Sequence, residues 1–373
     1  MRFDWLVVGA GLTGATFAER LATVLDQRVL VIDRRSHIAG NAYDYYDAEG
    51  LLVHGYGAHI FHTNSRKVWQ YLSRFTEWRP YEHRVLGSID GKLVPIPFNL
   101  TTLGALVPGA EGDRIESLLL EKVGIDQTIS VLKLLEHEDP RLRQVGELAY
   151  EKIFLGYSAK QWGMRPEDLD RSVTGRVPIV VSRDDRYFRD TFQGIPADGY
   201  TAMVQRMLNH DNIVVELGVD YCTAPKYLNI PRVLYTGPLD ELLDYQLQPL
   251  PYRSLRFETN HYNQELVQPV AVINFPNEHE YTRTLEHKHI TGQQHETTAV
   301  TTEWPQAHVP GENEPYYPVP EPVSRSRYST YQDMMGRKYP EFLIAGRLAD
   351  YRYYNMDQAV NRALVLFRER LLA

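Results

Sequence analysis

The sequence predicts an α/β protein that combines a parallel-sheet domain with a helical insertion and an antiparallel sheet domain. Three observations support this fold class. Within the first forty residues, a short apolar run, a glycine-rich turn, a helical pattern and a second apolar run follow one another. Residues 101–155 then repeat apolar side chains at helical spacing. From about residue 180 to 300 the pattern returns to short apolar runs typical of strands.

Length and composition limit the class of protein further. At 373 residues the chain is longer than one core usually holds, so we expect two or three domains. Its 43% hydrophobic and 24% charged residues are ordinary for a globular protein and exclude collagen-like, coiled-coil and low-complexity chains. The net charge of −8 lacks the basic surplus of nucleic-acid-binding proteins, so an anionic substrate must be met by a local group of Arg or Lys.

Cysteine usage and hydropathy predict a cytoplasmic location away from membranes. The single Cys222 excludes an internal disulfide and a cysteine-rich metal site. The stretch 93–110 contains three prolines and cannot form a spanning helix. Asp4 interrupts any signal-peptide pattern at the N-terminus.

The first strand, turn and helix carry a dinucleotide-binding pattern. The run Trp5–Val8 leads into Gly9–Gly14, and the second run, Val29–Ile32, ends at Asp33. In a Rossmann-type unit the first glycine permits the tight turn, the second admits phosphate to backbone N–H groups, and the third lets helix and strand pack closely. Asp33 follows Gly11 by 22 residues, a separation that suits a contact to an adenosine ribose. Because the full context is present, a glycine turn without a ligand is the weaker interpretation.

Later segments favour FAD over NAD. Residues 34–42 resemble the segment with which FAD-dependent enzymes hold the cofactor a second time, with Ala39 in place of the first of two adjacent glycines. Near the C-terminus a strand-like run, Phe342–Ala345, enters Gly346 and then a helix from about Met356. In such enzymes the chain returns late to close the cofactor site. We therefore expect an FAD-binding domain that is discontinuous in sequence.

The middle of the chain predicts two further domains. Residues 79–98 indicate a β-hairpin that turns at Asp90-Gly91, and residues 101–155 indicate three or more amphipathic helices. Strand-like runs follow at 213–215, 233–235, 255–257, 271–273 and 282–290. We assign residues 1–78, 191–245 and 316–373 to the FAD-binding domain, 99–178 to a helical domain with a mobile substrate loop near 163–177, and 79–98, 179–190 and 246–315 to the antiparallel sheet domain.

The chain offers no evident protein nucleophile, because it has no Ser-His-Asp set, paired-carboxylate spacing or nucleophile elbow. We therefore assign the chemistry to the cofactor. His54, His59 and His62, with His287 and His289 farther on, are not spaced as a metal-ligand set, so no metal is expected. Residues 57–63 are expected to form a wall beside the cofactor, with histidines packed at a helix start as the alternative.

Two polar segments suit a substrate that carries phosphates. Tyr157–Gly163 is followed by Arg165, Arg171 and Arg176, and we interpret the segment as a loop whose guanidinium groups could close over a diphosphate. Acidic neighbours leave a solvated charged loop as the alternative. Tyrosines cluster at 316–317 and 351–354, where phenols can donate to phosphate or sugar oxygens or can simply pack.

These segments resemble the prokaryotic UDP-galactopyranose mutase family along the whole chain. The matching segments are the N-terminal glycine pattern and residues 57–63, 81–85, 157–162, 174–178, 186–188, 281–283, 286–289, 316–318 and 346–357. The resemblance implies an isomerase that interconverts UDP-galactopyranose and UDP-galactofuranose with no net redox change. In that family the FAD must be reduced, and its flavin N5 attacks the anomeric carbon as UDP leaves.

The resemblance also implies roles for individual residues. Arg176 and Arg283 would clamp the diphosphate and act in catalysis together with His59 and His62. Substrate contacts would come from Phe154, Tyr157, Trp162, Tyr187, Asn274, Tyr316, Tyr317, Tyr353, His83 and Asn355, with Tyr157 stacked on uracil. FAD contacts would come from Gly9, Gly11, Thr13, Gly14, Asp33, Arg34, Gly40, Asn41, His59, Ile60, Gly346, Arg347, Asn355 and Met356. The family commonly has Asp at the position of Asn355, so substrate or flavin contacts there could differ.

The expected partners are the UDP-galactose substrate and further copies of the chain, with no nucleic acid and no membrane. Three alternatives stay open from the sequence. They are the same chemistry on UDP-N-acetylgalactosamine, an amine-oxidase-like flavin oxidoreductase, and a UDP-sugar-binding protein that keeps FAD only as structure. The oxidoreductase would not need the Arg176 and Arg283 pair.

Overall fold

The computed structural model describes residues 2–165, 178–224, 229–319 and 321–372, which fall into two compact units. The first unit comprises Met1–Tyr81, Asp190–Ser254 and His308–Ala373. The second comprises Glu82–Arg189 and Leu255–Ala307. Both ends of the chain therefore belong to the first unit, and most of the predicted helical and antiparallel segments fall in the second. The division into three domains stays a prediction.

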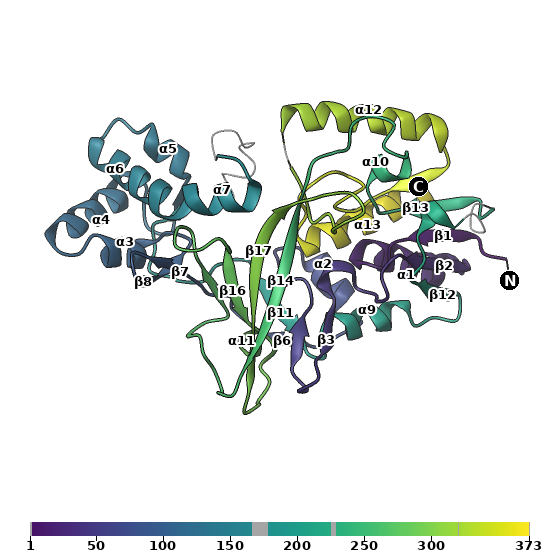
Figure 1. The fold of residues 1–373 in the computed structure, drawn as a ribbon, viewed down its shortest axis with the longest axis horizontal. Coiled ribbons are helices and arrows are strands. Elements are labelled where there is room, and N and C mark those ends of the chain that lie inside the picture. Colours follow the sequence, from purple (N-terminus) through teal and green to yellow (C-terminus); the bar gives the residue numbers. More distant parts are fainter. Residues whose placement is uncertain (1, 166–177, 225–228, 320, 373) are drawn as a thin grey trace. The chain divides into compact units, whose positions relative to one another are not determined.

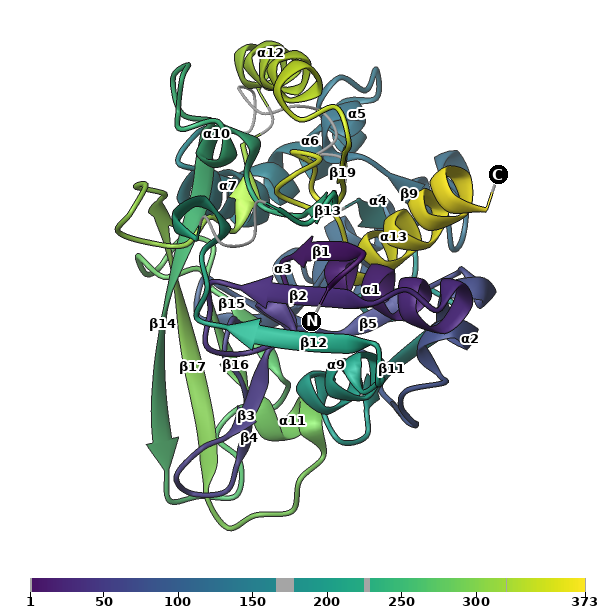
Figure 2. The ribbon, with the colours of Figure 1, turned by 90° about the vertical axis from the view of Figure 1, so that its right-hand side faces the viewer.

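The first unit is built on a parallel sheet assembled from distant parts of the chain. Its strands lie in the order β12 (Ile213–Leu217), β2 (Val29–Asp33), β1 (Trp5–Val8), β13 (Arg232–Tyr235) and β19 (Phe342–Ile344), as Figure 2 shows for β12, β2 and β1. Every neighbouring pair is parallel. The predicted discontinuous Rossmann-type domain is thereby confirmed.

Helices cover both faces of this sheet, because successive strand residues point to opposite sides. Val7 and Val31 pack in one apolar core with α1 (Leu12–Leu25), α9 (Tyr200–Leu208) and α13 (Met356–Leu371). Leu6 and Leu30 pack on the other side with residues of α10 (Leu239–Leu242) and α12 (Pro322–Lys338). Burial of both faces explains why β1 and β2 are continuous apolar runs in the sequence.

Shorter elements complete the first unit. β3 (Asp44–Tyr46) pairs with β4 (Leu52–His54), and β11 (Phe192–Pro196) lies between β5 (Phe61–Thr63) and β6 (Trp78–Pro80). β18 (Tyr317–Pro318) pairs with the first two residues of β14 (Tyr252–Tyr262). The described part of this unit also contains α2 (Arg66–Leu72) and the 3-10 turns Gly40–Ala42 and Tyr221–Thr223. His62 lies in a strand, so the alternative of histidines at a helix start is wrong for this residue.

The second unit contains the predicted amphipathic helices, visible as the blue and teal group in Figure 1. They are α3 (Leu100–Leu106), α4 (Ala110–Lys122), α5 (Val131–Leu135) and α6 (Pro140–Ala149). Asn99, Ser130 and Asp139 cap three of them by accepting a backbone N–H of the first turn. β9 (Thr128–Ile129) pairs with β10 (Ile179–Val180).

The prediction of a loop over Tyr157–Gly163 is wrong. α6 continues without a break through a π-helical turn, Tyr150–Leu155, into α7 (Gly156–Trp162). The helix ends only at Gly163, which takes the left-handed conformation with φ +67°. The polar residues of this segment therefore lie on a helix, and the π-helical turn is of the kind that often marks a functional site.

The sheet of the second unit has the strand order β14, β17 (Thr298–Ala307), β16 (Arg283–Glu286), β15 (Val272–Asn274), β7 (Val85–Ile89), β8 (Lys92–Ile96). β7 and β8 form the predicted hairpin, whose turn residues Asp90 and Gly91 both have positive φ. β15 pairs with β7 in parallel, so the sheet is mixed rather than purely antiparallel.

The strand predicted over residues 282–290 is wrong in its second half. The chain leaves the sheet after Glu286 and forms α11 (His287–Thr291). The fully buried Glu286 carboxylate accepts the backbone N–H groups of Val267 and Gln268 at 2.9 and 2.7 Å and the Thr298 hydroxyl at 2.8 Å. These contacts fix the point where the strand stops.

Candidate functional site

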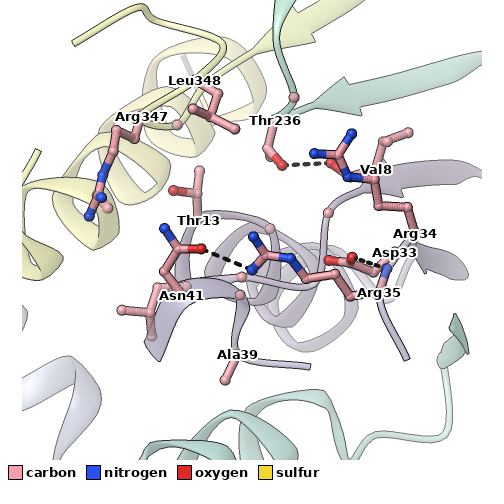
Figure 3. A pocket seen from close by; sticks show the side chains of 18 of the residues that line it. Val8, Thr13, Asp33, Arg34, Arg35, Ala39, Asn41, Thr236, Arg347 and Leu348 are labelled. Atoms are coloured by element: carbon pink, nitrogen blue, oxygen red, sulfur yellow. Dashed lines mark hydrogen bonds between the residues drawn. The ribbon is translucent and has the colours of Figure 1, made fainter. Parts of the chain in front are cut away.

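The turn between β1 and α1, residues Gly9–Gly14, forms a glycine cradle, a turn in which Gly9 and Gly14 leave no room for a side chain. A Cβ atom on Gly9, which has φ +108°, would overlap the hydroxyl of Thr236, and one on Gly14 would overlap the Gly9 carbonyl oxygen. Thr236 donates to the Val8 carbonyl at 2.7 Å (Figure 3). α1 begins after Gly11 without a side-chain cap. Its first backbone N–H groups are therefore suited to an anion such as a pyrophosphate.

The Asp33 carboxylate, at the end of β2, binds both the glycine cradle and the segment that follows β2. One carboxylate oxygen accepts the Ala10 N–H at 2.8 Å. The other accepts the Arg35 N–H at 2.9 Å, a bond drawn in Figure 3. Ala39 donates its N–H to the Ala10 carbonyl at 3.0 Å and has φ +71°, the conformation that favours the glycine expected there. Gly40 approaches Gly11 so closely that its Cβ would lie 3.0 Å from the Gly11 Cα.

Two arginines after β2 are engaged by carboxylates that the sequence analysis did not single out. Arg34 donates to Glu241 at 3.0 Å and to Glu314 at 2.8 Å, and Arg35 donates to Glu314 at 3.0 Å and to Asn41 at 2.9 Å. Burial acts to raise the pKa of Glu314, but Arg35 and Arg34 outweigh it and lower that pKa. The predicted cofactor residue Arg34 thus belongs to an ion-pair network that holds segments far apart in the chain.

Aromatic rings surround the predicted cofactor residue Arg347. Its guanidinium lies 5.4 Å from the centre of the Tyr317 ring and 5.9 Å from that of Tyr353, and the two rings stack at 5.1 Å. It also donates to the Tyr316 carbonyl at 3.3 Å. Three of the predicted substrate residues therefore gather around one predicted cofactor residue.

These segments enclose an open pocket beside the glycine cradle. Its lining contains the predicted residues Gly9, Gly11, Thr13, Gly14, Asp33, Arg34, Gly40, Asn41, His59, Tyr316, Gly346, Arg347, Asn355 and Met356. Ile60 is buried and is not part of the lining. The glycine cradle and the uncapped start of α1 fit a dinucleotide cofactor. Asn355 lines the pocket and also caps α13 through a reciprocal capping box with Gln358.

The predicted histidines take different places in the first unit. His59 lines the pocket, and its ring Nδ1 lies 3.0 Å from the Gly57 carbonyl oxygen. The backbone N–H of His59 donates to the ring Nδ1 of His54 at 3.2 Å. Burial lowers the pKa of His54 to about 4, so that ring is neutral and can accept this bond. His62 is not in the pocket lining, and its Nδ1 pairs with Asp190 at 2.8 Å.

The second unit places a row of polar residues across its sheet. Asn274 on β15, Arg283 on β16 and Glu303 on β17 are successive register partners and therefore point to the same face. Arg283 donates from Nε and from Nη2 to one oxygen of the buried Glu303, each at 2.9 Å. Asn274 Oδ1 and the other Glu303 oxygen are buried without a hydrogen-bond partner in the described part of the chain. Such atoms commonly mark the place of a polar ligand or water.

The other predicted residues of the second unit lie on its helical segment and near its hairpin. Phe154 is in the π-helical turn, and Tyr157 and Trp162 are on α7. The Tyr187 N–H donates to the carbonyl of the buried His83 at 2.7 Å, and the two rings lie 5.7 Å apart. Arg176 and the rest of 166–177 lie outside the described residues.

Comparison with known proteins decides the family. Residues 152–353, more than half of the chain, match the family described as UDP-galactopyranose mutase. The chain belongs to the UDP-galactopyranose mutase family. Because mutases of this family are isomerases, the chain is an isomerase. Residues 7–75 match an NAD(P)-binding Rossmann-like domain, as the glycine pattern predicted.

Relatives of the mutase family match nearly the whole chain. It is 36% identical over 364 residues to a "probable UDP-galactopyranose mutase" of Klebsiella pneumoniae, covering 96% of this chain and 92% of the relative. It is also 36% identical over 367 residues to a dTDP-fucopyranose mutase of Escherichia coli, covering 96% of each chain. A UDP-galactopyranose mutase of Mycoplasma genitalium is 33% identical over 96% of this chain and 92% of its own.

Solved structures support the mutase fold. A reduced UDP-galactopyranose mutase superposes with a TM-score of 0.74 at 14% identity, covering all of this chain and 96% of the other. A putrescine oxidase variant superposes at 0.54 with 11% identity and complete coverage of both chains, which shows a shared fold alone. Within the described residues, each helix is too short or too polar to cross a membrane.

Proposed function

We propose that this mutase-family member interconverts UDP-galactopyranose and UDP-galactofuranose on reduced FAD, with no net redox change. The observation that carries the proposal is the near full-length similarity to UDP-galactopyranose mutases at 33–36% identity. When bound, reduced FAD supplies the nucleophile that displaces UDP from the anomeric carbon. The residues of the chain would bind the two molecules, orient them and stabilise the leaving diphosphate.

The pocket of the first unit would hold the FAD. The start of α1 would receive the pyrophosphate, and Asp33 would contact the adenosine ribose beside the cradle that it holds together. Arg34 and Arg35 are already engaged by Glu241 and Glu314, so a phosphorylated ribose would meet carboxylates there. This favours FAD or NAD over NADP. Arg347, backed by two stacked tyrosines, would hold the flavin end.

The second unit would contribute the contacts to UDP. Arg283 presents a guanidinium that Glu303 has already oriented, and a fixed positive charge stabilises a leaving diphosphate more than a mobile one does. Arg176 would supply the second charge. Tyr157 on α7 would stack on the uracil, with Phe154 nearby, and Trp162 would line the pocket. Asn274 would donate to or accept from the sugar through its amide.

The test is direct conversion of the nucleotide sugar. Purified protein reduced with dithionite and incubated with UDP-galactofuranose should yield UDP-galactopyranose on chromatography, whereas the oxidised protein should yield little. A colourless preparation, or an unchanged nucleotide sugar after reduction, would overturn the proposal. Oxygen consumption with an amine and none with UDP-sugar would instead indicate an amine-oxidase-like enzyme.

A second candidate substrate is a dTDP-fucose, because the dTDP-fucopyranose mutase relative is as similar as any UDP-galactopyranose mutase described above. Parallel assays with UDP-galactofuranose, dTDP-fucofuranose and UDP-N-acetylgalactosamine separate the sugars. A preference of about tenfold or more in kcat/KM for dTDP-fucofuranose would reassign the substrate without changing the chemistry.

A further inference from the structure

Lys160 on α7 is held in a cage of backbone carbonyls. Its ammonium donates to the carbonyl oxygen of Phe275, to that of His279 at 2.8 Å and to that of Tyr281 at 3.2 Å. All three carbonyls come from the loop that joins β15 to β16. An ammonium has three donors and no acceptor, so one side chain can satisfy three carbonyls at once.

The loop is shaped independently of the lysine. The rings of Phe275, His279 and Tyr281 pack on one another, with centres 5.1 Å apart for Phe275 and His279, 5.0 Å for Phe275 and Tyr281, and 4.5 Å for His279 and Tyr281. Such mutual packing of aromatic rings restricts the loop and keeps its carbonyls pointed toward one place.

Two more contacts bring the helical segment onto this loop. Asn277 donates from its side chain to the Lys152 carbonyl in the π-helical turn at 2.9 Å. At the start of α7, a Cβ on Gly156 would overlap the Pro276 carbonyl oxygen and the Asn277 side chain. Glycine at this position therefore allows the backbones of helix and loop to touch.

The loop and the helix both adjoin residues assigned to the substrate. The loop begins directly after Asn274 and ends directly before Arg283, whereas α7 carries Tyr157 and Trp162. We propose that Lys160 is a positioning residue for the nucleotide, because its ammonium fixes the helix that contacts the base against the strands that contact the sugar and diphosphate. This inference rests on the proposed function of these residues.

The charge of Lys160 adds a pH dependence. Burial lowers its pKa to about 8, and the carboxylate of Glu278 on the same loop acts in the opposite direction. The loop also carries the titratable side chains of His279, Glu280 and Tyr281, and the rings of His279 and Tyr281 stack on each other. As the pH rises through about 8, the ammonium becomes an amine with one donor fewer and no charge, so nucleotide binding should weaken.

The experiment compares Lys160→Met, Lys160→Arg and the control Lys152→Met. Lys152 lies eight residues earlier, and its side chain pairs with Asp90 on the surface. Lys160→Met should raise KM for UDP-galactofuranose and the Kd for UDP by about tenfold, with a smaller effect on kcat and an unchanged flavin absorbance. Lys160→Arg should bind UDP with nearly the wild-type Kd at pH 7. Its Kd should stay the same up to pH 9.5, whereas the Kd of wild type should rise. Lys152→Met should match wild type.

Two results would overturn the inference. One is a UDP Kd for Lys160→Met within twofold of wild type, and the other is a wild-type affinity that does not fall between pH 7 and 9.5. If Lys160→Met does not fold, the pH dependence of UDP binding by wild type and Lys160→Arg still decides the matter. A wild-type protein that leaves UDP-galactofuranose untouched contradicts the proposed function, whereas the UDP titrations report on Lys160 separately.

Discussion

Arg283, assigned to the substrate, has a side chain held by a buried carboxylate. Its partner Glu303 is only 3% exposed, and a buried carboxylate of this kind would be costly without a cation beside it. The pair therefore fixes the direction of the guanidinium before any ligand arrives. A diphosphate has enough negative charge to bind this guanidinium even though one carboxylate already touches it.

Arg283→Ala and Arg176→Ala should each reduce turnover by at least about 100-fold, because each removes a charge that stabilises the leaving diphosphate. Steady-state assays with the reduced enzyme measure the effect. Arg183→Ala is the matched control, since the Arg183 side chain is 62% exposed and pairs with Glu116 at the surface. Near-normal rates in both test variants would refute the assignment of the two arginines to the diphosphate.

Glu303→Gln should raise KM and lower kcat, each by a factor of about 3 to 10, while the protein stays folded. Glutamine keeps an acceptor for Arg283 but loses the charge that orients it, so the guanidinium gains freedom. Glu258→Gln removes an exposed carboxylate that pairs with Arg256 on β14 and should change neither constant. Equal kinetics for the two variants would show that the orientation of Arg283 does not depend on Glu303.

At the scale of elements, the start of α1 has the strictest steric requirement. Gly14→Ala would place a methyl group on the Gly9 carbonyl oxygen, so we expect a loss of about 1–3 kcal/mol in stability and loss of flavin on gel filtration. Gly104→Ala on α3 is the control, because no atom lies within 4 Å of its added Cβ and alanine favours the helix by about 0.5–1 kcal/mol. Thermal unfolding and the absorbance of bound flavin give both readouts. Retained flavin in Gly14→Ala would contradict the assigned role of the cradle.

The junction of β16 and α11 should make stability depend on pH. Burial acts to raise the pKa of Glu286, but the hydrogen bonds from His289, Val267, Thr298 and Gln268 lower it below 4.5. The bond to Glu286 raises the pKa of His289 above 6.5. The contribution of His289 to the free energy of unfolding is therefore fully present below pH 6.5 and is lost as the pH rises through the folded-state pKa of the ring. The contribution of Glu286 is present above pH 4.5 and is lost as the pH falls through the folded-state pKa of the carboxyl.

His289→Ala should lower stability by about 1–2 kcal/mol at pH 6, with a smaller loss at pH 9, because raising the pH favours the neutral wild-type ring. Denaturant unfolding at the two pH values measures this difference. His261→Ala, at an exposed position on β14, serves as the control. A loss for His289→Ala that is the same at both pH values would show that the charged pair does not stabilise the junction.

Elements defined by local pattern could be predicted from the sequence, and those defined by distant contacts could not. The strand, glycine turn and helix at the N-terminus need only near neighbours, as does the hairpin at Asp90-Gly91, and both were predicted correctly. α7 was missed because its glycines and polar residues are typical of a loop, whereas the preceding helix and the loop at 275–281 hold it as a helix. The end of β16 depends on a buried carboxylate that bonds to residues on either side in sequence.

At the scale of the whole molecule, the candidate residues of each unit are brought together by contacts between different parts of the chain. Glu314 meets Arg34 across 280 positions, and Glu303 meets Arg283 only because β16 and β17 pair in a particular register. No local signal marks these carboxylates, so the predicted site contained the arginines and not their partners. The predicted cofactor residues belong to the first unit, whereas the predicted contacts to the base and Arg283 belong to the second. Each unit can therefore be impaired separately by mutation.

The absence of net redox change leads to a prediction for the complete enzyme. An isomerase returns every electron pair to where it began, so a single stoichiometric reduction under anaerobic conditions should support many turnovers. The flavin should stay bleached while UDP-galactofuranose is converted, and the amount of product should exceed the amount of dithionite added by at least about tenfold. Gly14→Ala, without flavin, should give no product under the same conditions. Product that stops at one equivalent of reductant would instead indicate a reaction that consumes electrons.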